Sequence, residues 1–125
     1  MKSRKTDNRK RIENQLDDLW RRAVLKRWGN KCAVCHKSEG VQSAHIFSRK
    51  NKSVRWDILN GISLCSRHHL FWAHKEPIEF AKFVEEKIGK EELEKLSYKA
   101  HQTVHYSIDD LLEIKRKLEE FLKEN

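Results

Sequence analysis

The chain has 125 residues, of which 38% are hydrophobic and 37% are charged, and its formal net charge is +8. This length favours a single domain with a modest core, and a core of that size often needs a bound metal ion for stability. No apolar run approaches the roughly 18 residues of a membrane-spanning helix, so we expect no membrane association, and the excess of Lys and Arg favours a polyanionic partner such as nucleic acid.

The N-terminal segment is basic and precedes a predicted helix. Residues 1–11 contain six Lys or Arg and predict a mobile basic arm, which either contacts the partner or only adds solubility. No apolar segment follows these charges, so we predict no secretory signal and a cytoplasmic location. Apolar residues at helical spacing predict a helix over residues 12–29, and Gly29 followed by Asn30 predicts its end.

Two pairs of metal-binding residue types follow this helix. Cys32 and Cys35 form C-x-x-C, and Cys65 and His68 form C-x-x-H. Four Cys and His ligands are typical of structural Zn²⁺, and a two-residue gap allows both members of a pair to reach one ion. The pairs are separated by 29 residues, whereas a classical DNA-binding zinc finger has about 12. The zinc ion is therefore predicted to close a longer loop that carries another feature.

Alternatives remain open for this zinc site. Cys32 and Cys35 could form a redox dithiol, although no βαβ pattern surrounds them, and Cys65 could be an ordinary buried thiol. His36 and His69 each lie beside a predicted ligand and could replace it. The chain has three cysteines, and an odd number excludes a complete set of intramolecular disulfides.

Between and just after the two pairs, the sequence predicts a strand at residues 41–47, a polar connection at 48–57, a second strand at 61–65 and a helix at 67–75. His45 lies near the end of the first predicted strand, Asn60 precedes the second, and His69 lies near the start of the helix. Phosphodiester hydrolysis requires a base that deprotonates water and a cation that stabilises negative charge. A histidine suits the first role because its ordinary pKa is near 6.5.

The order His45, Asn60, His69 between C-x-x-C and C-x-x-H resembles the HNH endonuclease family, most closely its small phage-type members. The resemblance covers about residues 30–76 and leaves the flanking helices unmatched. It implies an α+β fold with a ββα-metal (His-Me finger) core, made of a two-stranded hairpin and a helix, between N- and C-terminal helices. It also implies a DNA endonuclease in a bacterial or phage-infected cell.

The resemblance implies roles for individual residues. His45 would be the general base, Asn60 would hold the loop and so orient His45, and His69 would bind a catalytic Mg²⁺ or Mn²⁺, or Ni²⁺. His74 would be a further ligand to that metal or a phosphate contact. The cations of the loop would contact DNA phosphates, namely Arg49, Lys50, Lys52 and Arg55.

These assignments have alternatives. His45 could be a hydrogen-bonded strand residue, Asn60 with Gly61 is a common hairpin turn, and His74 could lie at the surface without a role. Ala44 stands where many family members carry an acidic residue or a histidine that binds the metal. A zinc-stabilised nucleic-acid-binding module without cleavage, acting in recombination, repair or packaging, is therefore our second hypothesis.

Residues 77–125 are predicted to form a C-terminal helical extension. Pro77 suits the first turn of a helix, and residues 89–106 predict a short helix. The stretch SIDDLLEIKRKLEEFLKE predicts an amphipathic helix with Ser107 as its N-cap. Its apolar face could pack on the N-terminal helix or on a second copy of the chain, so the oligomeric state stays open.

Overall fold

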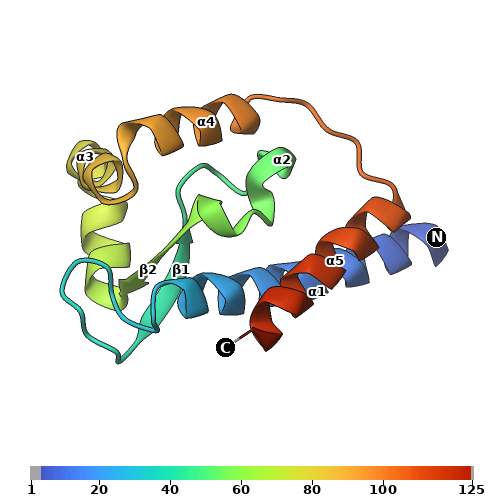
Figure 1. Cartoon of the computed structure of the whole chain (residues 1–125), viewed down its shortest axis with the longest axis horizontal. Coiled ribbons are helices and arrows are strands. Elements are labelled where there is room, and N and C mark those ends of the chain that lie inside the picture. Colours follow the sequence, from blue (N-terminus) through green and yellow to red (C-terminus); the bar gives the residue numbers. More distant parts are fainter. Residues whose placement is uncertain (1–3, 125) are drawn as a thin grey trace.

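The computed structural model describes residues 4–124, which form an α+β fold with one two-stranded hairpin, as predicted (Figure 1). The elements are α1 (Arg4–Arg27), β1 (Val41–His45), α2 (Lys52–Arg55), the 3₁₀ turn η1 (Ile58–Asn60), β2 (Gly61–Cys65), the π-helix η2 (His68–Ala73), α3 (Pro77–Ile88), α4 (Lys90–Ala100) and α5 (Ile108–Lys123). Within the described residues, no helix combines the length and apolar character that crossing a membrane requires.

Helix α1 is longer than predicted at its N-terminal end. It begins at Arg4 rather than at residue 12, so residues 4–11 of the predicted mobile arm belong to the helix, and residues 1–3 lie outside the described residues. Lys and Arg have good helix propensity, which allows the charged segment to extend the amphipathic one. The C-terminal end is as predicted: Gly29 and Asn30 adopt φ values of 69° and 57°, and the Asn30 N–H donates to the Leu25 carbonyl over 2.8 Å, the left-handed closure typical of helix ends.

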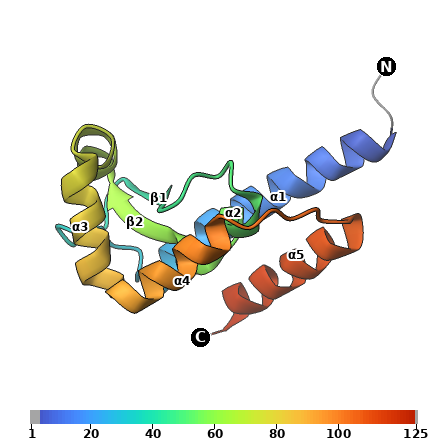
Figure 2. The same cartoon turned by 90° about the horizontal axis from the view of Figure 1, so that it is seen from above.

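Helix α5 lies alongside α1 in both views of the molecule (Figures 1 and 2). The shared core contains Leu16, Trp20 and Val24 of α1 together with Leu111 and Leu118 of α5. Ser107 caps α5 by accepting from the Asp110 N–H over 3.1 Å, and the Asp110 side chain completes a capping box. The apolar face of α5 therefore packs on the N-terminal helix, which was one of the two packing partners left open by the sequence.

The hairpin packs against α1, and the two approach each other closely at Gly61. The strands pair antiparallel, with Val41 opposite Cys65 and His45 opposite Gly61. A Cβ atom at Gly61 would lie 2.4 Å from Cγ2 of Val24, so only glycine permits this approach of β2 to α1. Residues 46–60 connect the strands, which means that Asn60 and Gly61 do not form a two-residue hairpin turn, and that alternative is wrong.

The strand connection is held between helices. It contains α2, where the sequence predicted only a polar loop. Val54 of α2 packs against Leu96 and Ala100 of α4, and the Ser53 hydroxyl donates to the Lys99 carbonyl over 2.6 Å. Figure 1 shows α2 between α4 and α1. The connection is therefore a packed part of the fold, able to fix the directions of the side chains that it carries.

Candidate metal site and histidine groove

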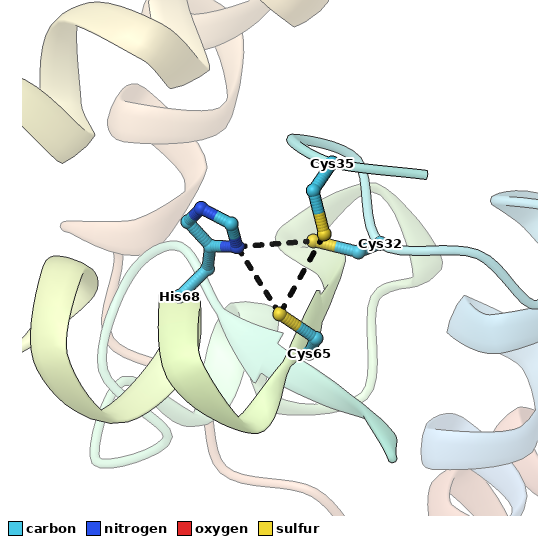
Figure 3. Close-up of side chains that lie close together, drawn as sticks. All are labelled: Cys32, Cys35, Cys65 and His68. Carbon is cyan, nitrogen blue, oxygen red and sulfur yellow. Dashed lines mark hydrogen bonds between the residues drawn. The ribbon is translucent and has the colours of Figure 1, made fainter. Parts of the chain in front are cut away.

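The four predicted zinc ligands come together in the structure (Figure 3). The Sγ atoms of Cys35 and Cys65 are 3.8 Å apart, and Nδ1 of His68 is 3.7 Å from the Cys32 Sγ and 3.1 Å from the Cys65 Sγ. Ligand atoms arranged as a tetrahedron around Zn²⁺, at bond lengths of about 2.3 Å for sulfur and 2.0 Å for nitrogen, stand roughly 3.5 to 3.8 Å apart. The Cys₃His cluster is therefore compatible with one zinc ion.

The turn that carries Cys32 and Cys35 is closed by backbone hydrogen bonds. The His36 N–H donates to the Cys32 carbonyl over 2.9 Å, and the Cys32 N–H donates to the Lys37 carbonyl over 2.8 Å. Burial alone would raise the pKa of the Cys32 thiol, but backbone hydrogen bonds to it hold that pKa below its ordinary value. A lowered thiol pKa favours the thiolate, which is the form that binds a metal ion.

His68 completes the cluster, and its neighbours in sequence do not. Nδ1 of His69 lies 2.8 Å from Oε1 of Gln42 on β1, and His36 is exposed outside the cluster. Among the described residues, no other group of three or more His, Cys, Asp or Glu side chains is placed to hold one metal ion. His68 is therefore the fourth candidate ligand, a position that the sequence left open.

A groove of about 700 Å³ brings four of the other predicted site residues together, whereas Asn60, Lys50, Lys52 and Arg55 are not part of its lining. Its lining includes His45 at the end of β1, Arg49 from the strand connection, and His69 and His74 from the segment after β2. Apolar side chains of β1 and α3 form much of the remaining wall, among them Ala44, Phe80 and Val84. The groove thus combines three imidazoles and one guanidinium in a mostly apolar surrounding, which strengthens electrostatic interactions.

The π-helical geometry of η2 explains why His69 and His74 share this groove. In an α-helix, residues three or four apart lie on one face, and residues five apart do not. A π-helix has i→i+5 hydrogen bonds and a wider turn, and such segments are frequent at functional sites. The ring centroids of His69 and His74 are 5.0 Å apart. Burial, and then the nearby His74, lower the pKa of His69, so both effects favour the neutral imidazole that binds metals.

His45 is held on two sides and is only partly buried. Its ring stacks on Trp20 of α1, with centroids 3.8 Å apart and planes 6° from parallel. Its Nε2 lies 3.0 Å from the Arg55 carbonyl oxygen. Because a carbonyl only accepts, Nε2 carries the proton of the neutral ring, and Nδ1 keeps a lone pair. Burial, the largest effect, lowers the pKa of His45 below its ordinary value, so the ring is neutral at pH 7.

Asn60 ties the strand connection to the start of β2. It is fully buried. Its Oδ1 accepts from the Phe47 N–H over 2.8 Å, and its Nδ2 donates to the carbonyls of Phe47 and Val54 over 2.9 and 3.1 Å. These bonds fix the connection at Phe47 and at Val54, and Val54 directly precedes Arg55, whose carbonyl contacts His45. The Asn60 side chain therefore holds the loop on which the position of His45 depends.

Substitution of Asn60 by Ala should destabilise the fold by about 3 to 5 kcal/mol, because each buried group left without its partner costs about 1 to 3 kcal/mol. Urea unfolding of the zinc-loaded protein measures this loss. Asn51→Ala is the matched control, since the Asn51 side chain makes no capping hydrogen bond at the start of α2, and its effect should stay within about 0.5 kcal/mol. Equal effects of the two substitutions would contradict the role of Asn60.

The four predicted phosphate contacts occupy different environments. Arg49 lines the groove, and Lys50 and Lys52 are exposed. Arg55 differs from the other three, because its side chain is only 15% exposed and its Nη2 pairs with Oδ2 of Asp17 over 2.8 Å. Its main-chain carbonyl, rather than its guanidinium, contacts the candidate site.

Two residues of the site were not found from the sequence, namely Asp17 and Trp20 on α1. Both lie outside residues 30–76, to which the HNH resemblance is confined. The available signal was the position of Asp17 within the apolar stripe of α1, since it is three residues before Trp20 and seven before Val24. A carboxylate that is buried on such a stripe is rarely left unpaired. The sequence did not show which cations would pair with it.

Comparison with known proteins supplies no further assignment. Searches with protein-family models, among curated proteins and among solved structures gave no significant match. The functional conclusion therefore depends on the Cys₃His cluster and on the groove that contains the three histidines.

Proposed function

We propose that the chain is a metal-dependent DNA endonuclease of the HNH type, with a ββα-metal core made of β1, β2 and the helical segment after β2. The observation that carries this proposal is the convergence of His45, His69 and His74 on one groove. The Cys₃His cluster supports it, because a zinc ion there would join the turn before β1 to the end of β2 and the segment after it. Zinc would then stabilise the core, and the groove would carry the chemistry.

His45 is proposed as the general base. The lone pair on Nδ1 accepts a proton from water while the Arg55 carbonyl holds Nε2. The water oxygen attacks phosphorus, the bond from phosphorus to the leaving sugar oxygen breaks, and that oxygen takes up a proton. Stacking on Trp20 restricts the ring to one plane, so the base is positioned before the substrate binds.

His69 and His74 are proposed as the ligands of a catalytic divalent cation. The cation would supply Lewis-acid stabilisation of the phosphate and of the leaving oxygen. Imidazole nitrogen suits Ni²⁺, Zn²⁺ and similar ions, whereas Mg²⁺ prefers oxygen ligands. We therefore expect Ni²⁺ to support cleavage better than Mg²⁺. Ala44 is 5% exposed and provides no ligand, which leaves coordination positions for water and phosphate oxygens.

The charge of the chain favours a nucleic-acid substrate. The net charge is +8, and Arg49 places a half-exposed guanidinium at the groove. Within the part of the chain that the structure describes, Lys50 and Lys52 form no ion pair and remain able to contact phosphates. Contacts of this kind position a duplex without reading its sequence.

A second candidate function is a zinc-stabilised nucleic-acid-binding module that does not cleave. Ala44 favours this second function. With alanine at this position, only the imidazoles of His69 and His74 are left to bind a metal, and two ligands bind it less tightly than three. This module would use the same positive charge and the same Cys₃His cluster. The two candidates differ only in whether His45, His69 and His74 have a role beyond stability.

The test starts from a complex of zinc-loaded protein and fluorescent duplex DNA in buffer without a second metal. Addition of Mn²⁺ or Ni²⁺ should convert the bound duplex to cleaved product, and removal of the added ion should stop the reaction. A duplex that stays bound and intact with Mn²⁺, Ni²⁺ and Mg²⁺ would instead support the binding module.

The pH dependence of cleavage should report the lowered pKa of His45. Burial, Arg49 and Arg55 lower this pKa, while the Arg55 carbonyl and Asp17 raise it, with a net decrease. His45 must be neutral to accept a proton, so the acid limb of the rate profile should have its midpoint below about pH 6.5, the ordinary pKa of histidine. A pH profile of kcat/KM measures this limb, and a midpoint above pH 7 would contradict the assignment.

A further inference from the structure

Asp17 lies at the centre of a hydrogen-bond cluster beside the groove, although it belongs to α1. Its Oδ1 accepts from Nε of Arg55 over 3.1 Å and from Nε1 of Trp56 over 2.8 Å. Its Oδ2 accepts from Nη2 of Arg55 over 2.8 Å and from Nη2 of Arg49 over 3.1 Å. Burial alone would raise the pKa of Asp17, but hydrogen bonds from Arg55 and Trp56 and the two positive charges hold it below its ordinary value. The carboxylate is therefore ionised, and both oxygens are engaged.

The two arginines that pair with Asp17 differ in how many of their N–H donors remain available to a substrate. Arg55 gives Asp17 a bidentate contact, and its side chain is 15% exposed. Arg49 gives a single nitrogen, and its side chain is 55% exposed. A guanidinium has five N–H donors, so most of those on Arg49 stay free at the groove. The ion pair with Asp17 thus orients the Arg49 guanidinium and leaves most of its N–H donors able to bind a phosphate.

We propose that Asp17 is the positioning residue of the histidine groove, aiming Arg49 at the substrate phosphate and fixing Arg55 so that its carbonyl holds His45. This inference rests on the proposed endonuclease function and adds a role for α1, which the HNH resemblance does not cover. The carboxylate connects the phosphate-binding cation and the general base, so one side chain sets the distance between them. Asp17 itself touches neither substrate nor metal.

A purely electrostatic role for Asp17 predicts the opposite result from a positioning role. Asp17 reduces the positive charge at the groove, so its neutralisation should strengthen phosphate attraction. If Asp17 positions Arg49 and Arg55, the same change should slow cleavage, because misplacement of the reacting groups by about 1 Å can cost roughly 100-fold in rate. Binding and turnover are therefore expected to separate.

The experiment compares Asp17→Asn with Asp18→Asn in the full-length, zinc-loaded protein. Asp18 is the matched control, because it lies next to Asp17 on α1, is 65% exposed and, among the described residues, forms an ion pair only with Arg22, at 3.8 Å. Single-turnover cleavage of a labelled duplex and fluorescence anisotropy give the rate and the Kd. Asp17→Asn should cleave at least about 10-fold more slowly with an equal or lower Kd, and Asp18→Asn should match the wild type within about two-fold.

The pH profile gives a readout that a merely structural role would not move. The charged groups that act on His45 are Asp17, which raises its pKa, and Arg49 and Arg55, which lower it. His69 and His74 also line the groove, and Asp17→Asn leaves both in place. Loss of the Asp17 charge should therefore move the acid limb of the rate profile to lower pH.

Arg49→Lys tests the same proposal without disturbing the buried carboxylate. This substitution keeps the positive charge and the contacts of Asp17 to Arg55 and Trp56. It removes the planar guanidinium, whose paired N–H donors can bind two oxygens at once. We expect slower cleavage with little change in Kd. A folded Asp17→Asn or Arg49→Lys protein that cleaves at the wild-type rate overturns the positioning role. A wild-type protein that cleaves nothing overturns the endonuclease function and, with it, this inference.

Discussion

Cys65→Ser should abolish zinc binding and unfold the hairpin with the segments that pack on it. The cluster joins three parts of the chain, namely the turn after α1, the end of β2 and the helical segment after β2. Structural zinc contributes an apparent free energy of about 10 to 16 kcal/mol in small domains, whereas whole domains are stable by about 5 to 15 kcal/mol. Loss of one ligand therefore removes as much stability as the domain has.

The unfolding should be local at first. The core between α1 and α5 is a separate cluster from the one that contains Cys32, Cys65 and Val84, so part of the helix signal in circular dichroism should persist. Amide exchange should become fast in β1, β2 and α3. Zinc content, melting temperature and amide exchange measure these effects. Ser66→Ala changes the neighbouring exposed residue and serves as the control. An apo protein with protected hairpin amides would contradict the structural role of zinc.

Local sequence rules predicted the zinc ligands and both strands. The pairs C-x-x-C and C-x-x-H are short-range patterns whose geometry needs little knowledge of the rest of the fold. The strands follow from runs such as GISLC, which is buried along its whole length as β2. Ser107 was recognised as an N-cap for the same reason, because capping depends on residues only three positions apart.

The parts that were missed depend on contacts between distant segments. Asp17 meets Arg55 across 38 residues of sequence, and only the packing of α1 on the hairpin brings them together. Asn60 and Gly61 suggested a turn, yet Gly61 is required by its contact with Val24. Tertiary packing decided each of these positions.

His45→Ala should reduce the rate of DNA cleavage by about 100-fold to 10,000-fold, which is the usual contribution of a general base. DNA affinity should change little, because His45 carries no charge at pH 7 and the cations of the loop are unaltered. The substitution removes the stacking contact with Trp20, which is worth about 0.5 to 1.5 kcal/mol, so the zinc-loaded protein should remain folded. The predicted loss therefore concerns catalysis rather than folding.

His105→Ala is the matched control for this substitution. His105 is an exposed histidine that lies outside the groove and outside the Cys₃His cluster. It should retain the wild-type rate, zinc content and melting temperature. The comparison of the two variants shows whether the loss of activity is specific to His45 or follows from the removal of any histidine.

The most direct measurement is the nicking of supercoiled plasmid by the wild type, His45→Ala and His105→Ala, each carrying one zinc ion per chain, with and without added Mn²⁺ or Ni²⁺. We predict that the wild type and His105→Ala nick the plasmid only with the added ion, and that His45→Ala does not nick it. Equal nicking by all three proteins would contradict the proposed active site. If no protein nicks the plasmid although all bind it, the endonuclease function is wrong.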